Sequence, residues 1–413
     1  MHDTDLYRHL LGIQEPWRVV NVELDLSDEV VRVYIDFDGA KAAFCCPECG
    51  KYANLYDRRE TRSWRHLDSC QFKTFLVASL PRVSCRQHSV QTASVFWCEP
   101  NSRFTALFER FALDVLQATQ VQVRAAQLLR LSPDQVQYLM HRAVARGLQR
   151  RDPNQTIAHA GLDEKSFQQR HRYATVLSDL DQARIIDIIE NRTQEAATAL
   201  LSDALTDSQK AGVQSVTMDM WPAFANAQAD VLPKAEIVHD RYHIAGYLND
   251  AVDKTRKDEH RSLSREEDNT LSNTKYLWLR SEATLSEKQK QSLDALSGLE
   301  LKTAHVWAFK ECFRQFFACR TEYGAHAFFR QWYEAALALG NTHLTKVAKM
   351  LNRHLEGLLA YIRHRRTNAA AENLNGQIQR IKTNARGFRR FANFRVAILF
   401  FLGKLDLYPQ TFR

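Results

Sequence analysis

The order of apolar segments between residues 157 and 239 constrains this chain more than any other feature of its sequence. Three short segments rich in β-branched residues come first, as expected for strands, at residues 157–163, 171–180 and 183–190. A helix, a strand, a second helix and a last strand are then expected at residues 192–205, 213–220, 223–231 and 235–239. This alternation predicts a mixed sheet flanked by helices.

Two aspartates stand at strand ends of that pattern. Asp163 ends the first predicted strand and Asp219 ends the fourth. In a sheet of this order the two strands are neighbours, so their carboxylates can share one pair of divalent cations, as phosphoryl transfer requires. The alternative is that each aspartate is an ordinary turn residue. Trp221, close to Asp219, either packs or stacks on a displaced base, and packing is the commoner role.

A third acid occurs in a strongly basic segment. Between residues 362 and 395 there are nine lysines and arginines, and Glu372 is the one acid. Leu374, Ile378 and Ile381 form an apolar stripe on the predicted helix, and Glu372 points roughly opposite to it. A metal ligand beside phosphate-binding cations accounts for this pattern, whereas a solvated basic helix does not explain the lack of other acids. The cations nearest to the helix are Arg380, Lys382, Arg386, Arg389 and Arg390.

The N-terminal hundred residues carry two short metal-binding motifs. Cys46 and Cys49 are separated by two residues, as are Cys85 and His88, and Gly50 permits the tight turn that the first pair needs. Four such ligands suit a closed tetrahedral zinc site, and a hairpin can fill the gap between the pairs, so we expect a zinc-ribbon-like module. Unrelated thiols are the alternative. Other cysteines could enter the ligand set: Cys45, Cys70 and Cys98.

Residues 125–131 and 132–145 have the proportions of a helix-turn-helix. Ser132 is a natural N-cap, and Pro133 suits the first helical position. An ordinary helical hairpin is the alternative. If the second helix reads DNA, the side chains able to reach bases or phosphates are Gln135, Gln137, Tyr138, His141 and Arg142.

Length and charge agree with several domains and a polyanionic partner. The 413 residues suit about two to four domains, and the net charge of +8 favours nucleic acid as a partner. The N-terminus lacks a signal-peptide pattern, and the apolar run 396–402 is too short to span a bilayer. We therefore expect a cytoplasmic, nucleoid-associated protein with reduced thiols and no membrane contact.

Several blocks, in order along nearly the whole chain, resemble the ISL-three family of insertion-sequence transposases. They are the motifs CPECG and CRQH, residues 103–105, 162–164, 218–222, 235–243, 368–375 and 387–394. The resemblance implies a DDE transposase whose RNase H-like core is interrupted by a helical insertion before its glutamate. The order of predicted strands is also that of the RNase H-like fold.

Carried over residue by residue, the resemblance places the catalytic triad on Asp163, Asp219 and Glu372. The long interval between Asp219 and Glu372 leaves room for the insertion. Asp240 and His243 match a supporting Asp-x-x-His element, and Asp240 is the alternative second carboxylate. Cys45, directly before the first zinc motif, is a departure from the family pattern and puts the zinc ligand set in question.

We thus expect a multidomain α+β protein. Its parts are a zinc-binding module at 1–100, a helix-turn-helix region at 101–155, an RNase H-like α/β core at 156–243 and 368–413, and an all-helical insertion at 244–367. It would bind terminal inverted repeats and target DNA as a dimer or larger oligomer, with Mg²⁺ or Mn²⁺ for catalysis and structural Zn²⁺. The alternatives are an RNase H-like nuclease or resolvase, and a non-catalytic DNA-binding regulator. The insertion could serve dimerisation, DNA contact or covering of the active site.

Overall fold

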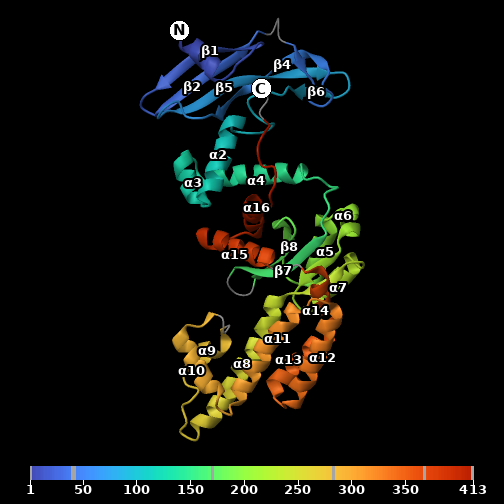
Figure 1. Ribbon diagram of the computed structural model, residues 1–413. Coiled ribbons are helices and arrows are strands. Elements are labelled where there is room, and N and C mark those ends of the chain that lie inside the picture. Colours follow the sequence, from blue (N-terminus) through green and yellow to red (C-terminus); the bar gives the residue numbers. More distant parts are fainter. Residues whose placement is uncertain (1, 39–42, 169–171, 281–283, 366–368, 411–413) are drawn as a thin grey trace. The chain divides into compact units, whose positions relative to one another are not determined.

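The computed structural model divides the chain into two compact units (Figure 1). Unit 1 comprises Met1–Arg151 and Leu405–Arg413, and unit 2 comprises Asp152–Lys404. The residues described are 2–38, 43–168, 172–280, 284–365 and 369–410.

Unit 1 begins with helix α1 (Asp3–Leu10) and a sheet in the order β1-β2-β5-β4-β3, with β6 paired to β5. The strands are β1 (Trp17–Asp25), β2 (Val30–Phe37), β3 (Phe44–Cys45), β4 (Tyr52–Arg65), β5 (Lys73–Cys85) and β6 (Ser89–Thr92). Trp17, Phe37, Trp64 and Trp97 are buried in one aromatic core. The antiparallel pair β4–β5 fills the gap between Cys49 and Cys85, where a hairpin was expected.

Three helices follow the sheet in unit 1: α2 (Ala106–Thr119), α3 (Gln122–Leu129) and α4 (Pro133–Gln149). The start of α4 is fixed by a reciprocal cap. The Ser132 hydroxyl accepts the Gln135 amide at 3.2 Å, and the Gln135 side chain accepts the Ser132 amide at 2.9 Å. Arg130, in the left-handed region at φ 55°, ends α3. Both helices of the predicted pair are thus present, with Ser132 and Pro133 in the expected roles.

The end of the chain packs within unit 1. The Arg146 guanidinium donates to the Leu407 carbonyl, and the Tyr408 hydroxyl donates to Asp114 at 2.6 Å. Gly147 is required for this approach, because a Cβ atom there would lie 2.6 Å from the Leu405 side chain. We expected residues 368–413 to form one part of the core, and these contacts instead assign residues 405–410 to unit 1.

Unit 2 contains a five-stranded sheet in the order β11-β10-β7-β8-β9. The strands are β7 (His159–Gln168), β8 (Arg172–Asp179), β9 (Arg184–Glu190), β10 (Ser215–Met218) and β11 (Glu236–His239). Strands β7, β10 and β11 are parallel, while β8 pairs antiparallel with both β7 and β9. All five predicted strands are present in the predicted order, with helices α5 (Gln194–Ala204), α6 (Asp207–Gly212) and α7 (Pro222–Val231) between them.

One strand differs from expectation in a way that affects the site. The first strand was expected to end at Asp163, but β7 continues to Gln168 because it pairs with β8 over that whole length. It pairs with β10 only as far as Gly161. Asp163 therefore lies just beyond the point where β10 stops, on a strand that continues.

The described part of the chain after β11 is helical, as expected. Its helices are α8 (Arg241–Ser264), α9 (Lys275–Leu279), α10 (Glu287–Ser297), α11 (Lys302–Ala318), α12 (Glu322–Ala338), α13 (Thr342–Arg353), α14 (Leu355–His364), α15 (Ala369–Asn384) and α16 (Phe391–Leu402). Helices α8 and α11 to α13 lie side by side around buried aromatic residues that include Phe313, Phe316, Phe329 and Trp332 (Figure 1). The expected boundary between insertion and final helix, at residues 367 and 368, lies outside the described residues.

Helix α16 contains the longest apolar run of the chain. Phe394, Ile398 and Leu399 are fully buried, so the run is part of the interior of unit 2. Within the described ranges, no helix combines the length and apolarity needed to cross a membrane.

Candidate functional site

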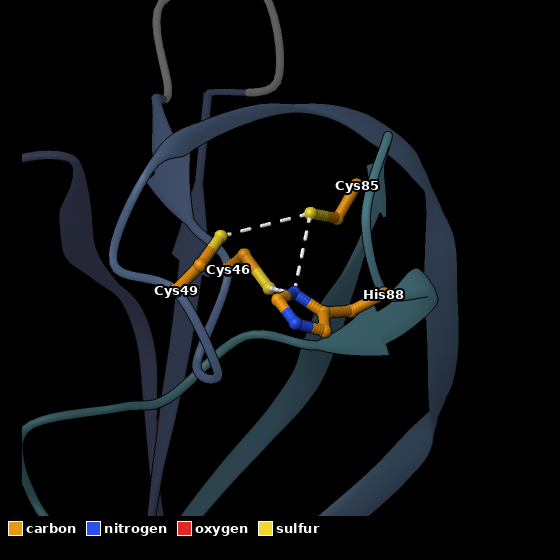
Figure 2. A group of neighbouring side chains, drawn as sticks. All are labelled: Cys46, Cys49, Cys85 and His88. Carbon is orange, nitrogen blue, oxygen red and sulfur yellow. Dashed lines mark hydrogen bonds between the residues drawn. The ribbon is translucent and has the colours of Figure 1, made fainter.

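Cys46, Cys49, Cys85 and His88 converge in unit 1 (Figure 2). Their ligand atoms lie within 4.8 Å of one another. The Sγ atoms of Cys49 and Cys85 are 3.7 Å apart, and the Nδ1 atom of His88 lies 3.6 Å from Cys46 Sγ and 3.7 Å from Cys85 Sγ. Ligands bound tetrahedrally to zinc at ordinary bond lengths lie about 3.6–3.8 Å from one another. The separations thus fit one zinc ion.

The local backbone prepares this group for a metal. Gly50 is in the left-handed region at φ 69°, and its amide donates to the Cys46 carbonyl at 2.9 Å, which closes the first turn. In the second turn, the backbone amides of Gln87 and His88 lower the pKa of the Cys85 thiol to about 6. Because thiolates rather than thiols bind zinc, this environment favours the ligand form.

The other candidate ligands of unit 1 lie outside this group. Cys45 and Cys70 are exposed, and Cys98 is buried in the aromatic core, where burial raises its pKa to about 12. Nδ1 of His66 lies 2.8 Å from the Thr105 hydroxyl, and burial lowers the pKa of His66 to about 4. Its partner and burial therefore give His66 a structural role.

On α4, two of the five side chains expected to contact DNA are engaged within unit 1. The Tyr138 hydroxyl donates to the Asn101 carbonyl at 2.9 Å, and Arg142 lies 3.2 Å from the carboxylate of Glu99. Gln135 forms the helix cap already described. Of the other two, Gln137 is partly buried and His141 is exposed. The α4 surface that carries Tyr138 and Arg142 thus packs against the segment before α2.

In unit 2, Asp163 is held from α15 as well as by its own strand. The Asn375 side-chain amide donates to Asp163 Oδ2 at 2.6 Å, and Lys165 Nζ lies 3.5 Å from the same oxygen. Helix α15 also contacts β7 further along, where Lys382 donates to the Ser166 carbonyl at 2.6 Å. These contacts bring a late segment of the sequence against the first strand of the sheet.

Asp219 directly follows β10 and is held from α8. The Tyr247 hydroxyl lies 3.1 Å and 3.3 Å from its two carboxylate oxygens, and His243 Nδ1 lies 3.5 Å from Oδ2. Burial, together with the Asp219 charge, raises the pKa of Tyr247 to about 12, so this hydroxyl stays protonated and donates. Tyr247 was not predicted, although it lies one helical turn after His243 on the same helix face.

Asp240 directly follows β11 and is the N-cap of α8, where it accepts the Tyr242 amide at 2.7 Å. It is 8% exposed, and its pKa is raised by burial and by the negative charges of Asp163 and Glu372. Nε2 of His243 lies 3.7 Å from Asp240, so this imidazole lies between Asp219 and Asp240. The predicted supporting pair therefore lies beside the predicted catalytic carboxylates.

Glu372 is exposed on α15, and the helix is buried along the predicted stripe of Leu374, Ile378 and Ile381. The negative charge of Glu372 contributes to the raised pKa of Asp240, so Glu372 lies within electrostatic range of this acid. Arg380, Arg386, Arg389 and Arg390 are all exposed after it, as expected for cations that could meet a phosphate backbone.

A small cavity is lined by Asp163, Asp219, Asp240, His243 and Asn375 among others, whereas Glu372 is not one of its lining residues. In the part of the chain that the structure describes, the carboxylates do not form a group as compact as that of the cysteines and His88. The site is thus a cavity walled by acids from β7, β10 and β11 and bordered by α15. Such an arrangement can attract divalent cations, which prefer oxygen ligands.

Comparison with known proteins gives two family matches and related transposases. Residues 160–398 match the transposase family ISL3 of the DDE class, and residues 42–88 match the zinc-finger of transposase IS204/IS1001/IS1096/IS1165. The chain is 24% identical over 416 residues to the transposase for insertion sequence element IS1557 of Mycobacterium tuberculosis, covering 94% of this chain and 93% of the relative. It is 26% identical over 348 residues to the transposase for insertion sequence element IS1001 of Bordetella parapertussis, covering 83% and 85%.

Proposed function

We propose that this chain, which belongs to the ISL3 family of DDE transposases, binds the terminal inverted repeats of an insertion sequence. It then catalyses metal-dependent DNA cleavage and strand transfer. The observation that carries the proposal is the cavity in unit 2, where Asp163, Asp219 and Asp240 meet beside the helix of Glu372. Acids from adjoining strands are what a two-cation phosphoryl-transfer site needs.

The topology of unit 2 supports an RNase H-like core. Its first three strands, β7 to β9, form an antiparallel meander, and β10 and β11 add in parallel on the other side of β7. In this proposal, helices α8 to α14 are an insertion between β11 and α15, and α15 brings Glu372 back to the sheet.

The donor set fits divalent cations of the Mg²⁺ or Mn²⁺ kind. Carboxylate oxygens are the hard ligands that these ions prefer. The pKa of Asp240 is raised by burial and also by the charges of Asp163 and Glu372, and a cation would offset those charges. We assign metal binding to Asp163, Asp219 and Glu372. Bound cations would activate the attacking oxygen and stabilise the leaving one.

The residues around the triad have supporting roles in this account. Asn375 and Tyr247 each donate to one carboxylate and so fix the direction of its oxygens. His243 lies between Asp219 and Asp240, where its ring nitrogens can hold or pass a proton. Residues of α8 and α15 thus orient the proposed metal ligands.

DNA contact is assigned to cations on and after α15 and to unit 1. For the exposed Arg380, Arg386, Arg389 and Arg390 we propose phosphate contacts, with Lys382 also tied to β7. In unit 1 we propose a structural Zn²⁺ on Cys46, Cys49, Cys85 and His88, and repeat recognition through α4. His141 is exposed on α4, so its side chain is the first of this helix to test. Joining two ends requires a dimer or larger assembly, which would act at the nucleoid.

The test uses purified full-length chain, Mg²⁺, and duplexes that carry the inverted repeats flanking its gene. A transposase cuts at the repeat ends and joins the freed 3′-hydroxyl to target DNA. Cutting without joining would instead indicate a nuclease or resolvase. Binding without cutting would indicate a DNA-binding regulator, and either outcome would contradict the proposal.

A further inference from the structure

Trp221 is an exposed aromatic residue close in sequence to Asp219, which lines the proposed catalytic cavity. It lies two positions after Asp219, is the N-cap of α7, and donates its amide to the Asp219 carbonyl at 2.8 Å. Its side chain is 44% exposed, whereas Phe224, one turn later on the same helix, is 2% exposed. Phe224 therefore supplies the packing of this helix end, and the role of Trp221 lies at the surface.

A cation is fixed beside the Trp221 ring. The Arg192 guanidinium carbon lies 5.5 Å from the centroid of Trp221 and 4.1 Å from that of Tyr173 on β8. Arg192 also donates to both oxygens of Glu164, at 3.0 Å and 3.1 Å. These contacts hold the guanidinium against two rings and leave its side chain 41% exposed.

The group is tied to both strands that carry the predicted catalytic aspartates. Glu164 follows Asp163 on β7, and Trp221 comes two residues after Asp219 at the end of β10. A phosphate at these carboxylates would have the ring of Trp221 and the charge of Arg192 within the span of a neighbouring nucleotide. Aromatic rings stack on any base, and a nearby arginine adds electrostatic attraction to the phosphate backbone.

We propose that Trp221, backed by Arg192, is the stacking site for one unpaired nucleobase next to the scissile phosphate. The inference rests on the proposed function, because it takes DNA as the substrate and the carboxylates as its centre. The favoured occupant is a base because the exposed ring has a cation beside it and a phosphodiester-cutting site is proposed next to it. An apolar protein partner would not require that cation.

The first measurement is the rate of strand cleavage on inverted-repeat duplexes. Trp221→Ala should slow cleavage by about tenfold to a hundredfold, the effect expected from the loss of one base stack. Trp221→Phe should keep most of the rate because it retains a ring. Tyr323→Ala is the matched control, since Tyr323 is also an exposed aromatic residue, at 87%, on the distant helix α12.

The second measurement locates the base directly. Duplexes with 5-iodouracil at single positions flanking the cleavage point are irradiated while bound, and the crosslinked peptide is mapped. We expect one position to crosslink at Trp221, and the crosslink to disappear in Trp221→Ala while DNA binding is kept.

The outcomes separate this inference from the proposed function. Cleavage by the native chain, with an unchanged rate in Trp221→Ala and crosslinks elsewhere, overturns the stacking site alone. Failure of the native chain to cleave the repeat ends overturns the proposed function, and the stacking site with it. A Trp221→Ala effect on association between copies, with cleavage unchanged, would assign the ring to a protein interface instead.

Discussion

At the scale of single residues, the proposed mechanism depends most on whether Asp219 or Asp240 is the second metal ligand. Asp219 and Asp240 both follow parallel strands, and both have His243 beside them. Their environments differ, because Asp240 is 8% exposed and caps α8, whereas the Asp219 side chain is 28% exposed. The more accessible carboxylate is the better metal ligand, and the buried one is the better structural support.

Substitution at the two aspartates distinguishes these roles. Asp219→Asn should reduce strand cleavage by more than about a hundredfold, because a lost metal ligand removes several kcal/mol of transition-state stabilisation. Asp240→Asn should reduce it less, since the amide can still accept the Tyr242 amide hydrogen bond. The assay is cleavage of repeat-end duplexes in Mg²⁺. Full activity of Asp219→Asn together with an inactive Asp240→Asn would reverse the assignment.

The Tyr247 hydroxyl provides a finer test of the same carboxylate. Tyr247→Phe removes the donor to Asp219 and should raise the Mg²⁺ concentration needed for half-maximal cleavage by about tenfold, as expected for a group that orients a metal ligand. The rate at saturating Mg²⁺ should change little. Tyr242→Phe is the control, because that ring is 67% exposed. Equal Mg²⁺ dependence in both variants would remove Tyr247 from the site.

At the scale of elements, the strands of the unit 2 sheet were predictable from the sequence. Contacts between segments far apart in the sequence were not. The strands were predictable because each is a short segment rich in apolar residues, as in β9 with Ile185, Ile186 and Ile188. A hairpin was expected between the cysteine motifs, but the bounds of β4 could not be predicted because many of its side chains, such as Arg58 and Arg59, are exposed and polar. The contact of Tyr138 with Asn101 could not be predicted, since it depends on how α4 packs against a distant segment.

The buried contact between β11 and α14 was likewise not predictable from the sequence. His239 ends β11, its ring lies 4.9 Å from that of His354, and a Cβ atom at Gly357 would lie 2.3 Å from it. Burial lowers the pKa of His239 to about 4. No pattern in the sequence pairs Gly357 with His239, yet this contact sets the position of the chain directly before Asp240.

Gly357→Ala should therefore lower the free energy of unfolding of unit 2 by roughly 1–3 kcal/mol, because the added methyl group overpacks the His239 ring. Gly246→Ala is the matched control within α8. Nothing lies within 4 Å of a Cβ atom at Gly246, so this variant should gain up to about 1 kcal/mol from helix propensity. Denaturant unfolding measures both, and equal effects would contradict the packing account.

The buried histidines also predict a pH dependence. His239 has a folded-state pKa of about 4 against an ordinary value of 6.5, so the unfolded chain binds its proton more tightly. Its stabilising contribution is complete above pH 6.5 and is lost as the pH falls toward 4. Between pH 7 and pH 5 unit 2 should lose roughly 1–2 kcal/mol of unfolding free energy. The loss should be smaller in His239→Asn, and an identical loss would contradict the assignment.

At the scale of the whole molecule, the two units have different sources of stability. Both units have buried apolar cores, and unit 1 has in addition the group of Cys46, Cys49, Cys85 and His88 that could hold a metal ion. The metal motifs were fully predictable because ligand type and spacing are local features. The division of the chain was less predictable, since residues 405–410 join unit 1 through contacts such as that of Tyr408 with Asp114.

Zinc removal should act on unit 1 alone. The native chain should contain about one zinc per molecule, and Cys85→Ser should contain almost none. Limited proteolysis of that variant should cut near the cysteine turns while a fragment of unit 2 persists, because structural zinc contributes directly to folding. Cys312→Ser, at an exposed cysteine outside the group, is the control. Full zinc content in Cys85→Ser would contradict the ligand set.

We propose that Asp163, Asp219 and Glu372 bind the cations required for DNA cleavage and joining. The most direct measurement replaces each by cysteine and compares strand transfer in Mg²⁺ and Mn²⁺, because a thiolate is a poor ligand for Mg²⁺ and a better one for Mn²⁺. We expect Asp163→Cys, Asp219→Cys and Glu372→Cys to be inactive in Mg²⁺ and to regain activity in Mn²⁺. The corresponding alanine variants should stay inactive with either ion. Strand transfer in Mg²⁺ by any of the three cysteine variants at the native rate would contradict it.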